Sequence, residues 1–220
     1  MGYDVDMPAK PILYDFLYSG NSYRVRLLLS QLRIAYEYRA VDIIAGDTKQ
    51  PWFLKKNPAG EIPVLELPDG TCLRESSAIL MYLSEGTPFL PADKLNRTRV
   101  LEWLCFEQTH VDGVISRARF RRAYPKAIPT REEEFGPWMR EGARALGLME
   151  EHLQTRTFLV DERYTIADIG LYAYTHCAAD GGFDMSGYPN LHKWFARIEA
   201  MPGYLPIDRI PQGGTTASNI

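Results

Sequence analysis

The chain has 220 residues, of which 45% are hydrophobic and 24% charged, and its formal net charge is −3 at pH 7. This length allows one large or two small domains, and the balanced charge without a basic tract argues against nucleic acid or an anionic membrane as a partner. The first ten residues lack the apolar core of a signal peptide, and no stretch approaches the roughly 18 apolar residues of a membrane span, so we expect a cytoplasmic protein.

The cysteines and histidines indicate neither a disulfide framework nor a metal site. The three cysteines, Cys72, Cys105 and Cys177, are far apart and odd in number, and no C-x-x-C pair occurs. The four histidines also lack the spacing of metal ligands. We therefore expect free thiols in a reducing compartment and no bound metal.

The first elements along the chain predict a βαβ unit. Residues 11–16 and 36–41 have the character of short strands, and residues 23–33 have the apolar spacing of a helix between them. A strand, a helix of this length and a second strand form a right-handed unit with parallel strands. The S-G-N-S sequence at 19–22 separates the first strand from the helix, and as ordinary turn chemistry it would make Ser22 the helix N-cap.

Residues 57–76 predict a hairpin that runs into a helix, after one short helix near 52–56. Pro63 stands at the start of the apolar run 64–67, where a proline with a cis bond leaves the backbone of Ile62 unpaired. Pro68, Asp69 and Gly70 then predict the hairpin turn. Ser76 would cap the next helix, whose free amides would suit a carboxylate, although a capped helix after a hairpin needs no ligand.

The second half of the chain loses its strand signals and predicts helices. Residues 97–122 form one long helical pattern with a possible kink at Gly113, and a second helix is expected over 131–153. Thr165 and Asp168 form a capping box, and a last helix covers 191–198. We therefore expect a domain at 1–86, a linker at 87–97, a helical domain at 98–205 and a tail at 206–220.

The stretch IPVLELPDGTCLRESSAILMYL, residues 62–83, resembles the glutathione-binding half of the glutathione transferases. The T-x-x-D capping box is similar to the one in the helical domain of that family, and the resemblance covers nearly the whole chain. It implies an α/β + all-α fold, in which an N-terminal thioredoxin-like domain of order βαβ-α-ββα precedes a C-terminal helical bundle. It also implies glutathione as co-substrate and a homodimer.

The resemblance assigns glutathione contacts to several residues. Ile62, before Pro63, would pair its backbone with the cysteinyl residue, and Glu75 and Ser76 would hold the γ-glutamyl end. Thr48 stands where the compared patterns have a glutamine at the glycine carboxylate. Lys49 could replace that contact as a point charge.

The turn at 18–24 contains no cysteine, which excludes the mixed-disulfide chemistry of glutaredoxin-like relatives. A hydroxyl donor beside a helix N-terminus would instead stabilise the glutathione thiolate. Both the zeta-like and the nu-type bacterial patterns place Ser19 at the donor position, with Asn21 as its helper or replacement. Tyr14 and Tyr18 are alternatives, because other classes use tyrosine, but Tyr14 alternates within a strand and fits the core better.

The second substrate would lie against the long helix, where Arg119 is the candidate for an acidic or electrophilic group; an ion pair would explain the same arginine. We expect a dimeric, bacterial-type glutathione transferase that acts on a small electrophile, a peroxide or a disulfide. A zeta-like isomerase is a variant of this interpretation. The alternative from another class is a non-catalytic interaction module with the same fold.

Overall fold

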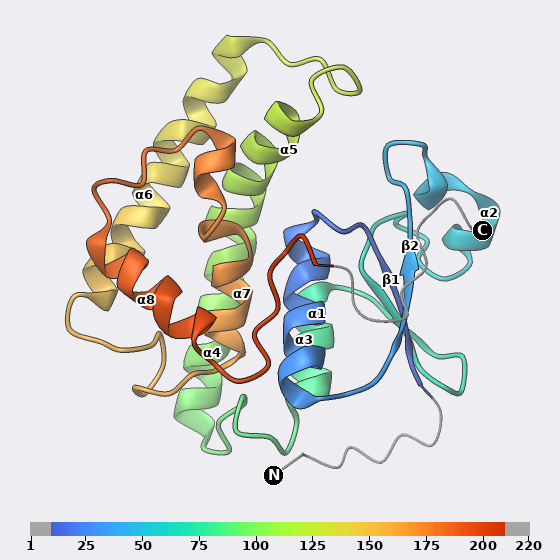
Figure 1. Ribbon diagram of the computed structural model, residues 1–220, viewed down its shortest axis with the longest axis horizontal. Coiled ribbons are helices and arrows are strands. Elements are labelled where there is room, and N and C mark those ends of the chain that lie inside the picture. The colour runs from blue at the N-terminus through green and yellow to red at the C-terminus, as the bar shows by residue number, and fades with distance from the viewer. Residues whose placement is uncertain (1–9, 210–220) are drawn as a thin grey trace. The chain divides into compact units, whose positions relative to one another are not determined.

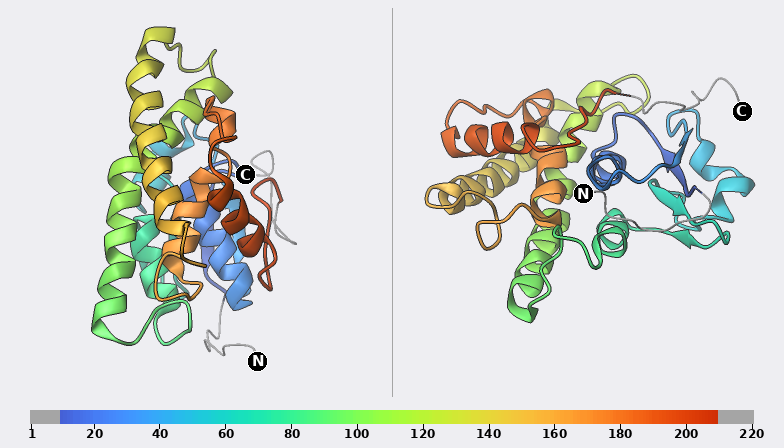
Figure 2. Two further views of the ribbon diagram at one scale, coloured as in Figure 1. Left: turned by 90° about the vertical axis from the view of Figure 1, so that its left-hand side faces the viewer. Right: turned by 60° about the horizontal axis from the view of Figure 1, so that its bottom comes forward.

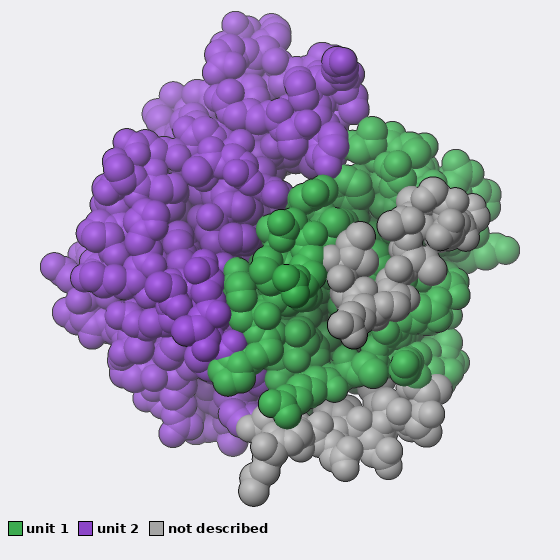
Figure 3. All heavy atoms as spheres, in the orientation of Figure 1, with its two compact units in different colours: residues 1–85, 202–220 green, residues 86–201 purple. Residues whose placement is uncertain are grey.

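The computed structural model describes residues 10–209. Their contacts divide them into two compact units, of which the first combines residues 10–85 with 202–209 and the second comprises residues 86–201 (Figure 3). No helix among the described residues is both long and apolar enough to cross a membrane.

The first unit is built on a mixed four-stranded sheet in the order β2-β1-β3-β4. The strands are β1 (Ile12–Asp15), β2 (Glu37–Ala40), β3 (Val64–Glu66) and β4 (Cys72–Leu73). β1 pairs with β2 in parallel, and the two remaining pairs are antiparallel. The predicted βαβ unit and the hairpin at 64–73 are therefore confirmed.

Helices cover both faces of this sheet (Figures 1 and 2). α1 (Gly20–Leu32) and α3 (Ser76–Ser84) pack together on one face, while a 3₁₀ turn, η1 (Asp47–Lys49), leads into α2 (Pro51–Leu54) on the other. Alternation along the strands fits this layering. Tyr14 of β1 and Val64 of β3 pack in a buried cluster with Phe53 of α2. Leu13, the residue before Tyr14 in β1, points to the opposite face of the sheet and is 0% exposed.

Two helix starts differ from the sequence prediction. α1 begins at Gly20, and Ser19 caps it by accepting a hydrogen bond from the Ser22 amide at 3.3 Å, so the prediction of Ser22 as N-cap is wrong. The cap of α3 is Glu75, which has φ 63° and ψ 108°, and Ser76 is the first helical residue. The prediction of Ser76 as N-cap is wrong because Ser76 is already helical, and its hydroxyl donates to the Asn21 side chain instead of capping the helix.

The second unit opens with one continuous helical stretch in three parts. α4 (Lys94–Phe106) passes into a π-helical segment, η2 (Glu107–Ser116), and then into α5 (Arg117–Ala123) (Figure 2). Gly113, the predicted kink, lies within the π-helical segment. α4 starts inside the stretch expected as linker, because Asp93 caps it by accepting from the Asn96 amide at 2.9 Å.

The predicted capping box opens one of the remaining helices of this unit. They are η3 (Glu132–Glu134), α6 (Phe135–Leu153), α7 (Ile166–Thr175), η4 (Ala178–Gly181) and α8 (Pro189–Glu199). Thr165 accepts from the Ala167 amide at 3.2 Å, and Asp168 accepts from the Thr165 amide at 2.9 Å, which confirms the box. The other Asp168 oxygen accepts from the Leu159 amide and the Trp194 indole. One buried carboxylate therefore joins three parts of the unit.

Residues 202–209, the returning segment, run along α1 (Figure 1). Tyr23 donates its hydroxyl to the Leu205 carbonyl at 2.8 Å, and Ser30 donates to the Gly203 carbonyl at 2.8 Å. Arg26 of α1 also donates to the carbonyls of Ile207 and Arg209, so residues 206–209, expected in a tail, are docked on the first unit. The rest of the expected tail, 210–220, lies outside the described residues.

Candidate functional site

Ser19 stands where β1 gives way to α1. Its backbone is extended, with φ −74° and ψ 123°, and its half-buried hydroxyl accepts from the Ser22 amide. A hydroxyl that accepts one hydrogen bond still has its own O–H to donate. Ser19 therefore combines a donor with the positive end of a 13-residue helix, an arrangement that favours an anion such as a thiolate.

Asn21 and Ser76 meet although they are 55 residues apart. The Ser76 hydroxyl donates to the Asn21 side-chain oxygen at 3.3 Å, and Ser76 is 6% exposed. This hydrogen bond joins the turn after β1 to the first residue of α3. The starts of α1 and α3 are thereby brought to the same side of the unit.

Glu75 presents an exposed carboxylate from a rare backbone conformation. Its φ of 63° is positive although it is not a glycine. Such conformations cost of order 1–3 kcal/mol and gather at ligand-binding positions. The conformation separates Glu75 from the helix and leaves its side chain in solvent beside Ser76.

Ile62 and Pro63 are joined by a cis peptide bond immediately before β3. Asn57 supports this stretch by donating its side-chain amide to the Glu61 carbonyl at 2.7 Å. Because β3 pairs antiparallel with β1, Ile62 lies at the end of the sheet from which the turn to Ser19 leaves. The predicted cis proline is confirmed.

Thr48 and Lys49 contact the loop that leads to Ile62. Lys49 donates its ammonium to the Gly60 carbonyl at 3.1 Å, whereas Thr48 is 5% exposed. Gly60 has φ 65°, and a Cβ there would lie 2.9 Å from the Thr48 carbonyl oxygen. Only glycine fits this close approach without strain. Lys49 therefore supports the loop, and its side chain is exposed.

Tyr14 belongs to the core, as expected. It is 2% exposed, and its hydroxyl donates to Glu66 at 2.8 Å. Lys56 pairs with the same carboxylate oxygen at 2.6 Å. Burial and the hydrogen bond to Glu66 raise the pKa of Tyr14, so this phenol stays protonated. Tyr18 is 47% exposed.

Arg119 lies in the helical unit, where it pairs with Asp180 of η4 at 3.1 Å. This is the ion-pair alternative that the sequence left open. An anionic second substrate at Arg119 would have to compete with that carboxylate.

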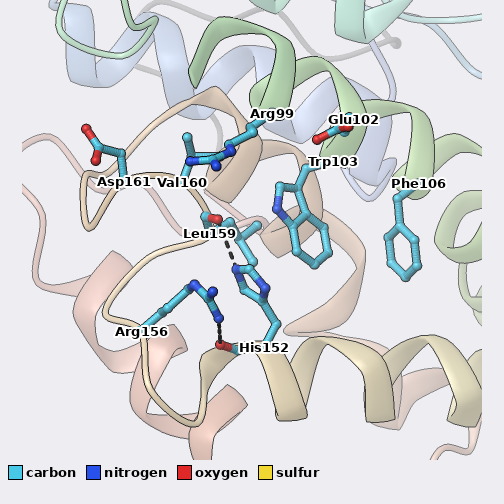
Figure 4. A pocket seen from close by; sticks show the side chains of 9 residues that line it. All are labelled: Arg99, Glu102, Trp103, Phe106, His152, Arg156, Leu159, Val160 and Asp161. Carbon is cyan, nitrogen blue, oxygen red and sulfur yellow. Dashed lines mark hydrogen bonds between the residues drawn. The ribbon is translucent and has the colours of Figure 1, made fainter. Parts of the chain in front are cut away.

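A cavity of about 480 Å³ in the helical unit was not anticipated (Figure 4). It is lined by Arg99, Glu102, Trp103, Phe106, His152, Arg156, Leu159, Val160 and Asp161. Trp103 lies edge-on to His152 with ring centroids 4.7 Å apart, and burial lowers the pKa of His152. The three-residue spacing of Trp103 and Phe106 on one helix was the available signal, but His152 comes from another helix.

No group of three or more histidine, cysteine or acidic side chains in the described part of the chain is arranged to hold a metal ion. The cysteines Cys72, Cys105 and Cys177 are all free thiols. Burial raises the pKa of Cys177 to about 11. This thiol is therefore a poor nucleophile at neutral pH.

Two family models match the chain. The model described as glutathione S-transferase, N-terminal domain, matches residues 13–88, and the model of the C-terminal domain matches residues 114–202. Together they cover most of both compact units.

Individual relatives agree with these matches. A solved glutathione S-transferase from Pseudomonas fluorescens Pf-5 is 46% identical, with a TM-score of 0.88 over 90% of this chain and 99% of that chain. A glutathione transferase homologue from Lodderomyces elongisporus, solved with two GSH per subunit, is 26% identical, with a TM-score of 0.80 over 89% and 95% of the two chains. The maleylacetoacetate isomerase of Rhizobium meliloti (strain 1021) is 32% identical over 92% of each protein.

Proposed function

Because this chain belongs to the glutathione transferase superfamily, we propose that it is a glutathione-dependent enzyme in which Ser19 stabilises the glutathione thiolate, with Asn21 as its helper. The observation that carries this proposal is the hydrogen bond between Asn21 and Ser76. It brings the turn of Ser19 together with the residues assigned to the γ-glutamyl end. One glutathione molecule could then contact both.

A site that binds the glutathione thiolate more tightly than the thiol lowers the thiol pKa, so more of the bound glutathione is ready to attack. A cysteine thiol has a pKa of about 8.5, so most of it is protonated at neutral pH. A hydrogen bond to a charged partner is worth roughly 1.5–3 kcal/mol, which corresponds to a fall of about one to two pKa units. The thiol proton passes to water, and the sulfur anion attacks the electrophile to form a carbon–sulfur bond while the leaving group departs with the bonding electrons.

The remainder of glutathione would extend along the same side of the first unit. The backbone of Ile62 would pair with the cysteinyl residue, and Glu75 with Ser76 would hold the γ-glutamyl group. Lys49 is better suited than Thr48 to the glycine carboxylate, because Thr48 is buried and Lys49 carries the charge.

The proposal is tested by the ultraviolet absorbance of the thiolate in bound glutathione, titrated against pH. We expect a lowered thiol pKa in the wild type that returns toward the free value in Ser19→Ala. Ser19→Thr is the matched control, since it keeps both the hydroxyl and the capping oxygen. A shift in Asn21→Ala but not in Ser19→Ala would make Asn21 the principal donor. A normal pKa in the bound wild type would contradict thiolate activation.

An isomerase is the second candidate, and the similarity to the maleylacetoacetate isomerase of R. meliloti favours it. In this reaction the thiolate adds to a double bond and leaves again after rotation, so glutathione is not consumed. Turnover of maleylacetoacetate at constant glutathione would identify the isomerase. Loss of glutathione with a chlorinated aromatic electrophile would identify the transferase, and no glutathione binding at millimolar concentration would favour an interaction module.

We further propose a cytoplasmic homodimer. Sedimentation equilibrium would then give about twice the chain mass of 25.1 kDa.

A further inference from the structure

We propose that Arg26 is a positioning residue that fixes the turn carrying Ser19 by joining it to the returning segment. This inference rests on the role proposed above for Ser19. Arg26 lies in α1 and is 0% exposed, as is its ion-pair partner Asp15. A charged side chain so deeply buried needs several partners, and those partners define what it holds together.

The guanidinium of Arg26 contacts three separate stretches of backbone or side chain. Its Nε pairs with Asp15 at the end of β1, at 2.8 Å. Its Nη2 donates both to the Leu17 carbonyl and to the Ile207 carbonyl, the latter at 3.1 Å. Its Nη1 donates to the Arg209 carbonyl at 3.3 Å. One guanidinium group therefore contacts the end of β1, the turn before Ser19 and the returning segment.

This geometry depends on the shape of arginine as well as on its charge. A guanidinium presents five donors in a rigid plane, whereas a lysine is a flexible point charge. Lysine at position 26 could keep the pair with Asp15 but not the set of carbonyl contacts. Arg26→Lys therefore separates the electrostatic role from the positioning role.

The buried carboxylate of Asp15 stabilises the position of the Arg26 guanidinium electrostatically. Burial raises the pKa of Asp15 to about 6, while Arg26 and Ser22 act against this rise. At neutral pH the carboxylate is ionised and requires the guanidinium beside it, because loss of one partner of a buried pair leaves an uncompensated charge.

The contact with Leu17 is the one that reaches the proposed donor. Leu17 lies two residues before Ser19, and the Ser19 amide closes the turn by donating to the Phe16 carbonyl at 2.8 Å. A displaced Leu17 carbonyl would therefore displace the Ser19 hydroxyl. Misplacement of a reacting group by about 1 Å can reduce a rate by about a hundredfold.

Ser30 provides a matched control. It ties the same returning segment to the same helix through the Gly203 carbonyl at 2.8 Å. Ser30 lies eleven positions after Ser19, near the other end of α1. Ser30→Ala therefore loosens the segment at a point remote from the turn.

The test uses full-length wild type, Arg26→Lys and Ser30→Ala, with thermal unfolding as a check of folding. For Arg26→Lys we expect the thiol pKa of bound glutathione to return toward the free value. We expect kcat to fall about tenfold or more, while the Kd for glutathione changes by less than about threefold. Amide hydrogen exchange at Ser19 should quicken in Arg26→Lys and remain unchanged in Ser30→Ala.

The outcomes distinguish this inference from the proposed function. A normal thiol pKa in the wild type overturns the role of Ser19, and exchange at the Ser19 amide still decides whether Arg26 holds the turn. Unchanged exchange and unchanged pKa in folded Arg26→Lys overturn the inference. If Arg26→Lys does not fold, Asp15→Asn/Arg26→Gln takes its place, because it removes both charges together and leaves neither unpaired. The same two readouts then decide.

Discussion

At the scale of single residues, the site depends on side chains with two duties. Ser19 caps α1 and is also the proposed thiolate donor, and Ser76 begins α3 and also donates to Asn21. A substitution at such a position changes structure and chemistry together. Their contributions can be separated only by measuring stability and glutathione binding on the same variants.

The hydrogen bond between Ser76 and Asn21 should be measurable as a coupling. We expect Ser76→Ala and Asn21→Ala each to weaken glutathione binding. The double variant should lose less than the sum of the two, by about 0.5–1.5 kcal/mol, the usual worth of a neutral hydrogen bond. Titration calorimetry of the four proteins gives this value. Strict additivity would show that the two residues act on glutathione independently.

His176 should make stability depend on pH. Burial lowers its pKa from 6.5 to about 4, and the ring stacks on Tyr172 with centroids 4.3 Å apart. The unfolded chain therefore binds a proton between pH 6.5 and 4 while the folded chain does not. The stability contributed by neutral His176 is present above pH 6.5 and is lost as the pH falls toward 4.

The variant His176→Gln isolates this effect from the buried carboxylates. Burial raises the pKa of both Asp15 and Asp168 to about 6, which gives slopes of opposite sign in an overlapping range. Denaturant unfolding of both proteins at a series of pH values gives the difference in free energy of unfolding. This difference should shrink on acidification, and a constant difference would contradict the assignment.

At the scale of elements, the π-helical segment of the second unit carries a glycine that its packing does not require. A Cβ at Gly113 would meet nothing within 4 Å, whereas a Cβ at Gly142 of α6 would come within 2.3 Å of Phe183. We expect Gly113→Ala to stabilise the protein by about 0.5–1 kcal/mol through helix propensity. Gly142→Ala should destabilise it, since the Phe183 ring would have to move. Thermal unfolding of the two variants checks both signs.

Most elements could be predicted from the sequence because their signals are local. The strand at 11–16, the cis proline, the Pro-Asp-Gly turn and the Thr165 capping box all follow from residues within a few positions of one another. The caps of α1 and α3 could not be predicted in this way. S-G-N-S offers two serines three residues apart, and no residue type near Glu75 marks it for a positive φ.

The sequence proposes residues for the candidate site but does not reveal the contacts between them. Ser19, Asn21, Ile62 and Ser76 were named from the sequence, yet the Asn21–Ser76 hydrogen bond spans 55 positions. Arg26 was missed because the partners that reveal its role, Ile207 and Arg209, lie some 180 positions further along the chain. No local pattern reports such contacts.

At the scale of the whole molecule, the first unit is discontinuous in sequence. Its returning segment approaches α1 closely, and a Cβ at Gly203, where φ is 77°, would lie 2.9 Å from the Cα of Gln31. We expect Gly203→Ala to be more destabilising than Gly46→Ala, a glycine with φ 87° and nothing within 4 Å. In both variants an alanine must adopt a positive φ, which costs about 1–2 kcal/mol of stability. The additional loss of stability in Gly203→Ala therefore measures the close approach to Gln31. Equal losses in denaturant unfolding would show that the segment adjusts.

The discontinuity has a consequence for biosynthesis. A ribosome releases residues 10–85 long before residues 202–209, so the nascent first unit folds without the carbonyls of Gly203, Leu205, Ile207 and Arg209. Until those carbonyls emerge, Arg26 keeps its contacts with Asp15 and Leu17 but lacks those with Ile207 and Arg209, and the Tyr23 hydroxyl lacks the Leu205 carbonyl. Synthesis of residues 202–209 thus completes the described first unit, and Arg26 gains its carbonyl contacts with Ile207 and Arg209 only once that segment has been made.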